Sequence, residues 1–213
     1  MSDIYASALI RDVLTRRQIR SADLFERVAA YALDNVGNIF SARRVSDFLK
    51  SQSRKAGHDT VAEYLAALCD AFLLRRVARF DLRGHAQLAM REKYYVGDHG
   101  LVNALLGFST GRLPGLLENI VQAELRVRGY EVSIGKLGDT EVDFVGQRRD
   151  ERIYVQVATS ILDPATRSRE YAPLFGIADS FPKFVVTMDD LAGGTQAGIR
   201  NVRIPDFLLD PTW

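Results

Sequence analysis

The sequence predicts an α/β protein, α+β overall, in which a helical first part precedes a mixed β-sheet. Three observations predict this class. Up to residue 72, apolar residues recur at helical spacing. Two predicted strands joined by a polar connection follow, between residues 73 and 96. From residue 113 a helix, three strands, a helix and a further strand succeed one another, an order that is typical of an α/β domain with a mixed sheet.

Composition limits the class of protein further. The chain has 213 residues, of which 47% are hydrophobic, so it can bury a substantial core. Charges occur throughout the first 30 residues, and no apolar run reaches the ~18 residues of a membrane span. We therefore expect a cytoplasmic protein with no membrane partner. Cys69, the single cysteine, falls in an apolar helical pattern and is expected to be a buried structural thiol.

Charge is unevenly distributed along the chain. Residues 41–93 carry 11 Lys/Arg and 6 Asp/Glu, whereas residues 94–213 carry 12 and 16. A basic block beside an acidic block indicates modules with different partners, although a plain solvated surface would give the same counts. We predict a helical segment over residues 1–40, a second module over residues 41–112, and an α/β domain over residues 113–213.

The second module is predicted to be a winged helix-turn-helix, two helices joined by a short turn and followed by two strands. Ser41 is expected to cap the first helix, which turns Phe48 inward. Thr60 and Glu63 have the spacing of a capping box, which would start the second helix there. The apolar face of that helix is expected to include Phe72.

The same module carries the basic residues that would contact phosphates in a complex with nucleic acid. They flank the helix pair or lie on the first strand: Arg43, Arg44, Arg54, Lys55, Arg75 and Arg76. The second helix is poorly equipped to read bases, because it lacks outward arginine, asparagine or glutamine. Its expected outward residues are Ala62, Glu63, Ala66, Ala67 and Asp70. Winged helices also dock on proteins, so a protein partner is the alternative expectation.

In the α/β domain, two neighbouring strands each place a polar residue on one predicted face. Side chains alternate between the two faces of a strand, so Asp143 points away from its apolar neighbours on the first strand. Gln156 points away from its apolar neighbours on the next strand in the same way. Glu118, near the start of the preceding helix, is expected to reach the same place. Carboxylates that converge there would hold Mg²⁺, which takes oxygen ligands, and the ion would activate water beside a phosphate. Local hydrogen bonding of two half-buried strand residues is the alternative.

The set Glu118, Asp143 and Gln156 resembles the PD-(D/E)XK nuclease-like superfamily, whose active members use a helix glutamate, a strand aspartate and a Glu-x-Lys. The resemblance implies a restriction-endonuclease-like α-β-β-β-α-β domain. Glu118 and Asp143 match the first two positions and are the implied magnesium ligands. Gln156 stands in place of the second acid, and Ala158 stands in place of the lysine. The implied catalytic site, Glu118, Asp143 and Gln156, is therefore degenerate.

A second resemblance covers nearly the whole chain. Its phrases, in order, are Asp34–Gly37, Asp59–Leu74, Lys93–Gly100, Leu117–Val121, "GYEVSIGKLGDTEVDFV", "IYVQVA", Arg169–Glu170 and "FPKFVVTMDD". Together they are similar to the C-terminal region, of unknown function, of prokaryotic AAA-type ATP-binding proteins. That region joins a winged helix to a nuclease-like fold.

This resemblance implies an AAA-type ATPase module of the same polypeptide as a partner, with residues 1–40 as a helical linker to it. The sequence contains no G-x-x-x-x-G-K-[ST] phosphate-binding motif, so ATP would bind only through that other module. We expect a nucleic-acid- or protein-binding module with an inactive nuclease-like domain and no cofactor of its own. The alternatives are a magnesium-dependent nuclease acting on DNA or RNA, and a structural domain that drives homo-oligomerisation.

Overall fold

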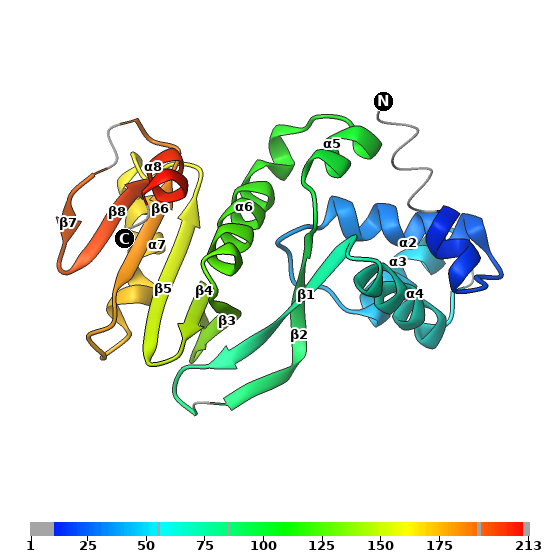
Figure 1. Cartoon of the computed structure of the whole chain (residues 1–213), viewed down its shortest axis with the longest axis horizontal. Coiled ribbons are helices and arrows are strands. Elements are labelled where there is room, and N and C mark those ends of the chain that lie inside the picture. Colours follow the sequence, from blue (N-terminus) through cyan, green and yellow to red (C-terminus); the bar gives the residue numbers. More distant parts are fainter. Residues whose placement is uncertain (1–10, 55, 85, 191–192, 211–213) are drawn as a thin grey trace. The chain divides into compact units, whose positions relative to one another are not determined.

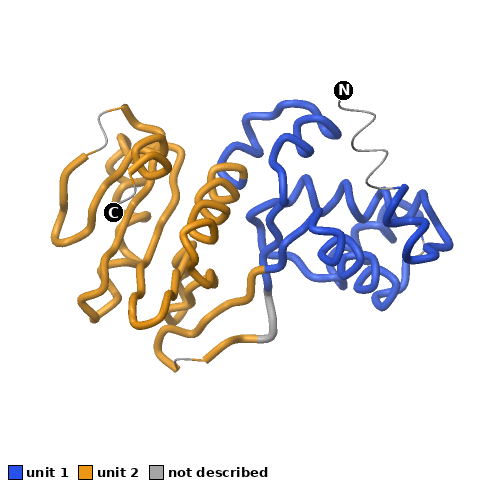
Figure 2. The backbone as a smooth tube through the Cα atoms, viewed as in Figure 1, with its two compact units in different colours: residues 1–76, 91–115 blue, residues 77–90, 116–213 orange. Residues whose placement is uncertain are grey.

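The computed structural model describes residues 11–54, 56–84, 86–190 and 193–210 (Figure 1). Within these residues the chain is α+β, as predicted, and it divides into two compact units (Figure 2). The first unit comprises Met1–Arg76 and Arg91–Gly115, and the second comprises Val77–Met90 and Leu116–Trp213.

The first unit is mainly helical. Its helices are α2 (Ala22–Asp34), α3 (Ala42–Ser51), α4 (His58–Asp70) and α5 (Gly100–Leu106), and residues 11–16 are also helical. The first amides of a helix lack intrahelical acceptors, so a side chain that accepts from one of them stabilises the start. At α3 the predicted cap is confirmed, because Ser41 Oγ accepts a hydrogen bond of 3.3 Å from the Arg44 amide.

The start predicted for α4 is wrong. The helix begins at His58, two residues before the predicted cap, and Thr60 and Glu63 lie inside it. Gly57 is the N-cap and makes no side-chain hydrogen bond. Asp59 in the first turn stabilises this earlier start, because a carboxylate there interacts favourably with the helix dipole.

Two aromatic residues predicted to be inward are instead at the surface. Phe72 lies beyond the end of α4, with φ 59°, and is 80% exposed. The helix ends in a left-handed turn, in which the Leu73 amide donates to the Leu68 carbonyl, and Phe72 occupies the left-handed position. Phe48 of α3 is 41% exposed, because the buried stripe of that helix consists of Val45, Ser46 and Leu49.

The mixed sheet predicted for residues 113–213 is confirmed, and the two strands predicted between residues 73 and 96 belong to the same sheet. The strands are β1 (Leu74–Asp81), β2 (Ala86–Val96), β3 (Glu131–Leu137), β4 (Thr140–Arg148), β5 (Glu151–Ala158), β6 (Lys183–Thr187), β7 (Thr195–Gln196) and β8 (Ile199–Arg203). Within the described residues the strand order is β2-β1-β3-β4-β5-β6-β8-β7. β4 is antiparallel to both its neighbours, whereas β1 and β3, β5 and β6, and β6 and β8 are parallel pairs.

Three helices accompany the sheet, and the first of them begins in the last residues of the first unit. They are α6 (Leu113–Val127), α7 (Pro164–Phe175) and α8 (Ile204–Leu209), and a short 3-10 turn, Thr110–Arg112, precedes α6. α7 connects the parallel strands β5 and β6 and packs against them. Its Tyr171 and Leu174 join Val145, Tyr154 and Val185 of the sheet in one buried cluster.

A bulge interrupts β4 where the sequence placed its candidate aspartate. The pairing of β3 with β4 shifts by one residue between Ser133 and Gly135. Two residues of β4, Asp143 and Phe144, therefore lie opposite a single residue of β3, Ile134. Bulges leave a backbone group without its ladder partner and change the direction of nearby side chains. Here the bulge frees the Asp143 amide for a different acceptor.

Candidate functional site

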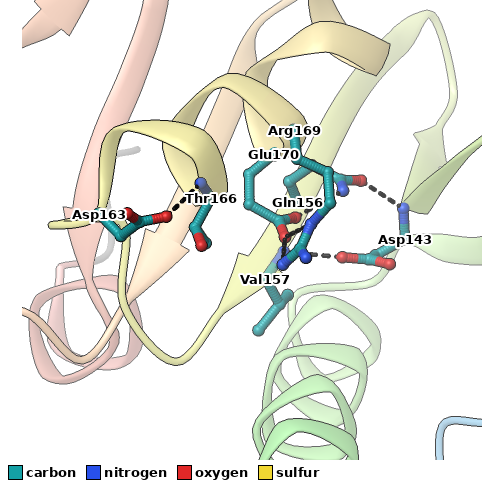
Figure 3. A network of polar contacts seen from close by, with 7 residues as sticks. All are labelled: Asp143, Gln156, Val157, Asp163, Thr166, Arg169 and Glu170. Carbon is teal, nitrogen blue, oxygen red and sulfur yellow. Dashed lines mark hydrogen bonds and ion pairs between the residues drawn. The ribbon is translucent and has the colours of Figure 1, made fainter.

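Asp143 and Gln156 meet beside this bulge, where β4 and β5 stop pairing (Figure 3). Backbone pairing between the two strands ends at Phe144 and Val155. Beyond that point Gln156 Oε1 accepts a hydrogen bond of 2.8 Å from the Asp143 amide. Asp143 Oδ2 in turn accepts one of 2.8 Å from the Val157 amide. Two side chains thus satisfy backbone amides that the strand ladder leaves without partners.

Sequence reasoning missed the third member of this cluster, Glu170 of α7. Gln156 Nε2 donates to Glu170 Oε2 at 3.1 Å, and Arg169 donates to Oε1 from Nε and Nη2, at 3.1 and 2.8 Å. The Glu170 side chain is 12% exposed, whereas that of Arg169 is 73% exposed. The sequence held one signal for this contact. Glu170 precedes the buried Pro173 by three residues and the buried Leu174 by four, so its carboxylate lies on the apolar face of the helix.

The first turn of α7 fixes the helix that presents Glu170. Asp163 is its N-cap and accepts a hydrogen bond of 2.7 Å from the Thr166 amide (Figure 3). This bond lowers the pKa of the Asp163 carboxyl. Pro164 occupies the start of the helix, where its missing amide hydrogen costs nothing. A capped and locally rigid start sets the rotation at which Glu170 faces the sheet.

The partners of Gln156 explain why this position holds an amide. The side chain is buried, with 6% of its surface exposed, and both ends of the amide are used. Its oxygen faces a backbone donor and its nitrogen faces the Glu170 carboxylate. A carboxylate at this position would offer no donor to Glu170 and would repel it instead. Gln156 therefore joins β4, β5 and α7 in one polar cluster.

The predicted magnesium site has a limited set of donors. In the described part of the chain, no group of three or more His, Cys, Asp and Glu side chains could hold a metal ion. An ion at Asp143 would share Oδ2 with the Val157 amide. Glu118 lies half-buried on α6. The magnesium site at Glu118 and Asp143 stays a prediction, as do the catalytic roles of Glu118, Asp143 and Gln156.

The basic residues predicted to contact nucleic acid fall into two groups, and Lys55 lies outside the described residues. Arg43 and Arg44 are exposed in the first turn of α3, and neither forms an ion pair with another described residue. Arg54 is exposed, with Nη1 3.9 Å from Asp23 Oδ2. The two arginines of α3 therefore keep their full charge available at the surface.

The arginines of β1 are less available. Arg76 is exposed, but its Nε lies 3.6 Å from Glu92 Oε1. Arg75 is half-buried and has an interaction partner of its own. Their contact with a nucleic acid stays a prediction.

The outward face of α4 is acidic. Asp59, Glu63, Ala66 and Asp70 are exposed and follow one another at helical spacing along one stripe. Ala67, predicted to be outward, is buried, because it lies on the stripe that packs into the unit. Asp70 pairs with the exposed Arg17, which precedes α2, and no residue of the exposed stripe itself is a cation.

Comparison with known proteins gives a family and two relatives. Residues 1–112 match a family model described as a domain of unknown function, DUF8612. An uncharacterized protein of Haemophilus influenzae is 32% identical over 209 residues, which cover 98% of this chain and 52% of the relative. An uncharacterized protein of Methanocaldococcus jannaschii is 29% identical over 139 residues, which cover 63% of this chain and 31% of the relative.

The chain thus spans 52% of the length of the first relative and 31% of the second. No solved structure matches it significantly. Among the helices that the structure describes, none has the length and apolarity needed to cross a membrane. The family match covers more than half of the sequence. The chain belongs to the DUF8612 family of domains of unknown function.

Proposed function

We propose that the chain is the nucleic-acid-binding module of an AAA-type ATPase, and that it binds nucleic acid without cutting it. Residues 41–112 would bind through a winged helix-turn-helix, and residues 113–213 would form a PD-(D/E)XK nuclease-like domain that has lost cleavage. The observation that carries the proposal is the bonding of Gln156, whose amide is committed at both ends to Asp143 and Glu170.

The chemistry of phosphodiester cleavage supports the absence of cutting. Cleavage needs a positioned nucleophile and a cation that stabilises the charge developing on the phosphate. Ala158 is buried, and its methyl group can do neither. Gln156 is neutral, and its oxygen already accepts from the Asp143 amide. The cluster thus holds strands and helix together where an active nuclease would keep its oxygens for a metal ion.

The order of elements and the length of the relatives support the architecture. α3, α4, β1 and β2 follow one another as two helices and a strand pair, which is the order of a winged helix-turn-helix. The succession α6-β3-β4-β5-α7-β6 is the order that the nuclease-like resemblance implies. The Haemophilus influenzae relative has about as much chain again beyond the matched part, which leaves room for an ATPase module.

Exposed cations support nucleic acid as the ligand. Arg43 and Arg44 lie together at the start of α3, where no described carboxylate neutralises them. Two cations in the first turn of a helix oppose its dipole and so cost a little stability. A phosphate would relieve that cost, because it pairs with guanidinium groups and also suits the positive end of a helix.

The test is to incubate the purified chain with labelled single- and double-stranded DNA and RNA in Mg²⁺ or Mn²⁺. Fluorescence anisotropy should show binding that weakens as salt rises, and a denaturing gel should show every strand intact. Arg43→Ala with Arg44→Ala should weaken binding. Arg148→Ala with Arg149→Ala, which removes the same charge from the β4–β5 turn, should not.

Two results would overturn the proposal. Metal-dependent shortening of the strands, abolished by Asp143→Ala, would establish the nuclease alternative. A chain that binds no nucleic acid at low salt would refute the proposed ligand. Should that chain also form a stable multimer, the oligomerisation alternative would take its place, and capture of a protein partner would establish the docking alternative.

A further inference from the structure

A line of aromatic rings in the first unit reaches the surface at Phe48. Inside the unit, Phe40 and Tyr94 are buried and stacked, with ring centroids 4.7 Å apart. Tyr31 of α2 contacts Phe40 edge-on at 5.6 Å and Phe48 of α3 at 4.8 Å. Phe48, at the outer end of this line, is the ring that is 41% exposed. Tyr31 therefore packs against the Phe48 ring, and the rest of that ring is exposed to solvent.

Two arginines lie on the same side of their helices as these rings. Arg44 precedes Phe48 by one turn of α3, and Arg27 precedes Tyr31 by one turn of α2, so each lies on the same side of its helix as the aromatic residue. Arg43 and Lys50 lie at the other edge of the exposed face of α3, and Arg54 follows the end of that helix. We call the set Arg27, Tyr31, Arg43, Arg44, Phe48, Lys50 and Arg54 the aromatic–basic surface.

Carboxylates on this surface are fewer than cations. Asp23 contacts Arg27 and also lies near Arg54, and Asp47 lies near Lys50. Five cations thus stand against Asp23 and Asp47, while Asp34, one turn after Tyr31 on α2, pairs with Arg112, so a positive excess remains. The excess is greatest at the start of α3, where Arg43 and Arg44 have no described carboxylate partner.

A ring flanked by cations suits an unpaired base. In a duplex the bases are stacked on one another and paired, so a protein ring at the surface meets only phosphates and groove edges. In a single strand each base has a free π-face, and proteins that bind single strands combine aromatic platforms with a positive groove for the backbone. Phe48 and the neighbouring arginines supply these two components.

The acidic face of α4 argues against the duplex alternative. A helix that reads a duplex lies in the major groove between two rows of phosphates. α4 would bring Asp59 and Glu63 into that groove, where phosphates would repel them, and its Asp70 is already paired with Arg17. The surface that attracts phosphates lies instead on α2 and α3.

We infer that the aromatic–basic surface binds single-stranded nucleic acid, with a base stacked on Phe48 and phosphates held by Arg43 and Arg44. This inference rests on the nucleic-acid binding proposed above and names the class of nucleic acid. Stacking on a ring is tolerant of sequence, because every base has a π-face. The surface therefore selects single strands rather than a particular sequence.

The test compares a labelled oligothymidine with a labelled hairpin duplex of mixed sequence by fluorescence anisotropy. The wild-type chain should bind the single strand more tightly. Phe48→Leu keeps an apolar contact with Tyr31 but removes the π-face, so it should weaken single-strand binding roughly 5- to 150-fold and leave duplex binding unchanged. Phe48→Trp should bind as tightly as wild type or more tightly. Phe72→Leu, which alters another exposed phenylalanine of the same unit, should have no effect.

The outcomes separate this inference from the function on which it rests. Tighter binding of the duplex, or equal single-strand binding by wild type and a folded Phe48→Leu, overturns single-strand stacking but leaves nucleic-acid binding in place. No binding of either ligand at low salt refutes the proposed function itself. Thermal melting checks that each variant is folded. Should Phe48→Leu fail to fold, the ratio of single-strand to duplex affinity for Phe48→Trp decides: an equal or higher ratio than wild type supports stacking, and a lower one overturns it.

Discussion

Replacing Gln156 by leucine probes the bonding that ties β4 and β5 to α7. Leucine has a similar size and fits the buried position, but it has no polar atom. The Asp143 amide would lose the acceptor at 2.8 Å, and Glu170 Oε2 would lose the donor at 3.1 Å. Both groups are in a partly buried setting, where water replaces a lost partner poorly.

The expected cost follows from these two bonds. A hydrogen bond between neutral groups contributes about 0.5–1.5 kcal/mol net, and one to a charged group about 1.5–3 kcal/mol. Their sum for Gln156→Leu is about 3 kcal/mol of local stability. Because 1.4 kcal/mol corresponds to a factor of about ten, amide hydrogens in β4 and β5 whose exchange needs local opening should exchange roughly a hundredfold faster.

Hydrogen–deuterium exchange with mass spectrometry measures this locally, and so does not require the two units to unfold together. Gln147→Leu is the matched control, because Gln147 also makes two hydrogen bonds, to Arg149 and Arg152, but lies nearer solvent. It should change exchange by less than tenfold. Equal exchange in wild type and Gln156→Leu would refute the structural role assigned to this residue.

Three further predictions concern the first unit. Ser41→Ala removes the cap of α3 and should lower stability by about 1 kcal/mol, seen as a lower melting temperature; an unchanged value would contradict the capping role. Gly97→Ala would place a Cβ 2.3 Å from the Phe72 carbonyl oxygen and should destabilise the unit by more than about 2 kcal/mol, whereas Gly111→Ala, whose nearest contact is 3.6 Å, should melt like wild type. Cys69, predicted to be buried, is half-buried, and this burial raises the pKa of its thiol to about 11, so iodoacetamide at pH 9 should alkylate it slowly in the folded chain and rapidly in urea. Since the folded pKa is the higher one, the contribution of this thiol to stability is complete below about pH 9 and falls as pH rises through 11, which urea midpoints of wild type and Cys69→Ala would show.

Elements with strong local signals could be predicted from the sequence. Ser41 before α3, Pro114 in the first turn of α6 and the apolar runs of β4 and β5 are local signals in the sequence, and all four elements are present. The boundary of α4 was harder, because Thr60 and Glu63 have the spacing of a capping box while Gly57 offers no side chain as a signal. Spacing alone does not decide which of two starts packs better.

Long-range pairing left little trace in the sequence. β1 pairs in parallel with β3, and β8 with β6, through contacts between residues far apart in the chain. The short α5 was also missed, since seven residues barely establish a helical period. The contact of Asp143 with Gln156 could be predicted from strand alternation. The contact of Glu170 with Gln156 could not be predicted, because it depends on how α7 packs against the sheet.

The most direct test of binding without cutting is a salt titration of single-strand binding in Mg²⁺. A denaturing gel measures the length of the strand at the lowest and at the highest salt concentration. Binding should weaken linearly on a log–log plot against salt, and the strand should stay intact. Each phosphate contact to a single strand contributes a slope of about 0.7, so Arg43→Ala with Arg44→Ala should reduce the slope by about 1.4. Shortened strands, or an unchanged slope in the double variant, would contradict the account.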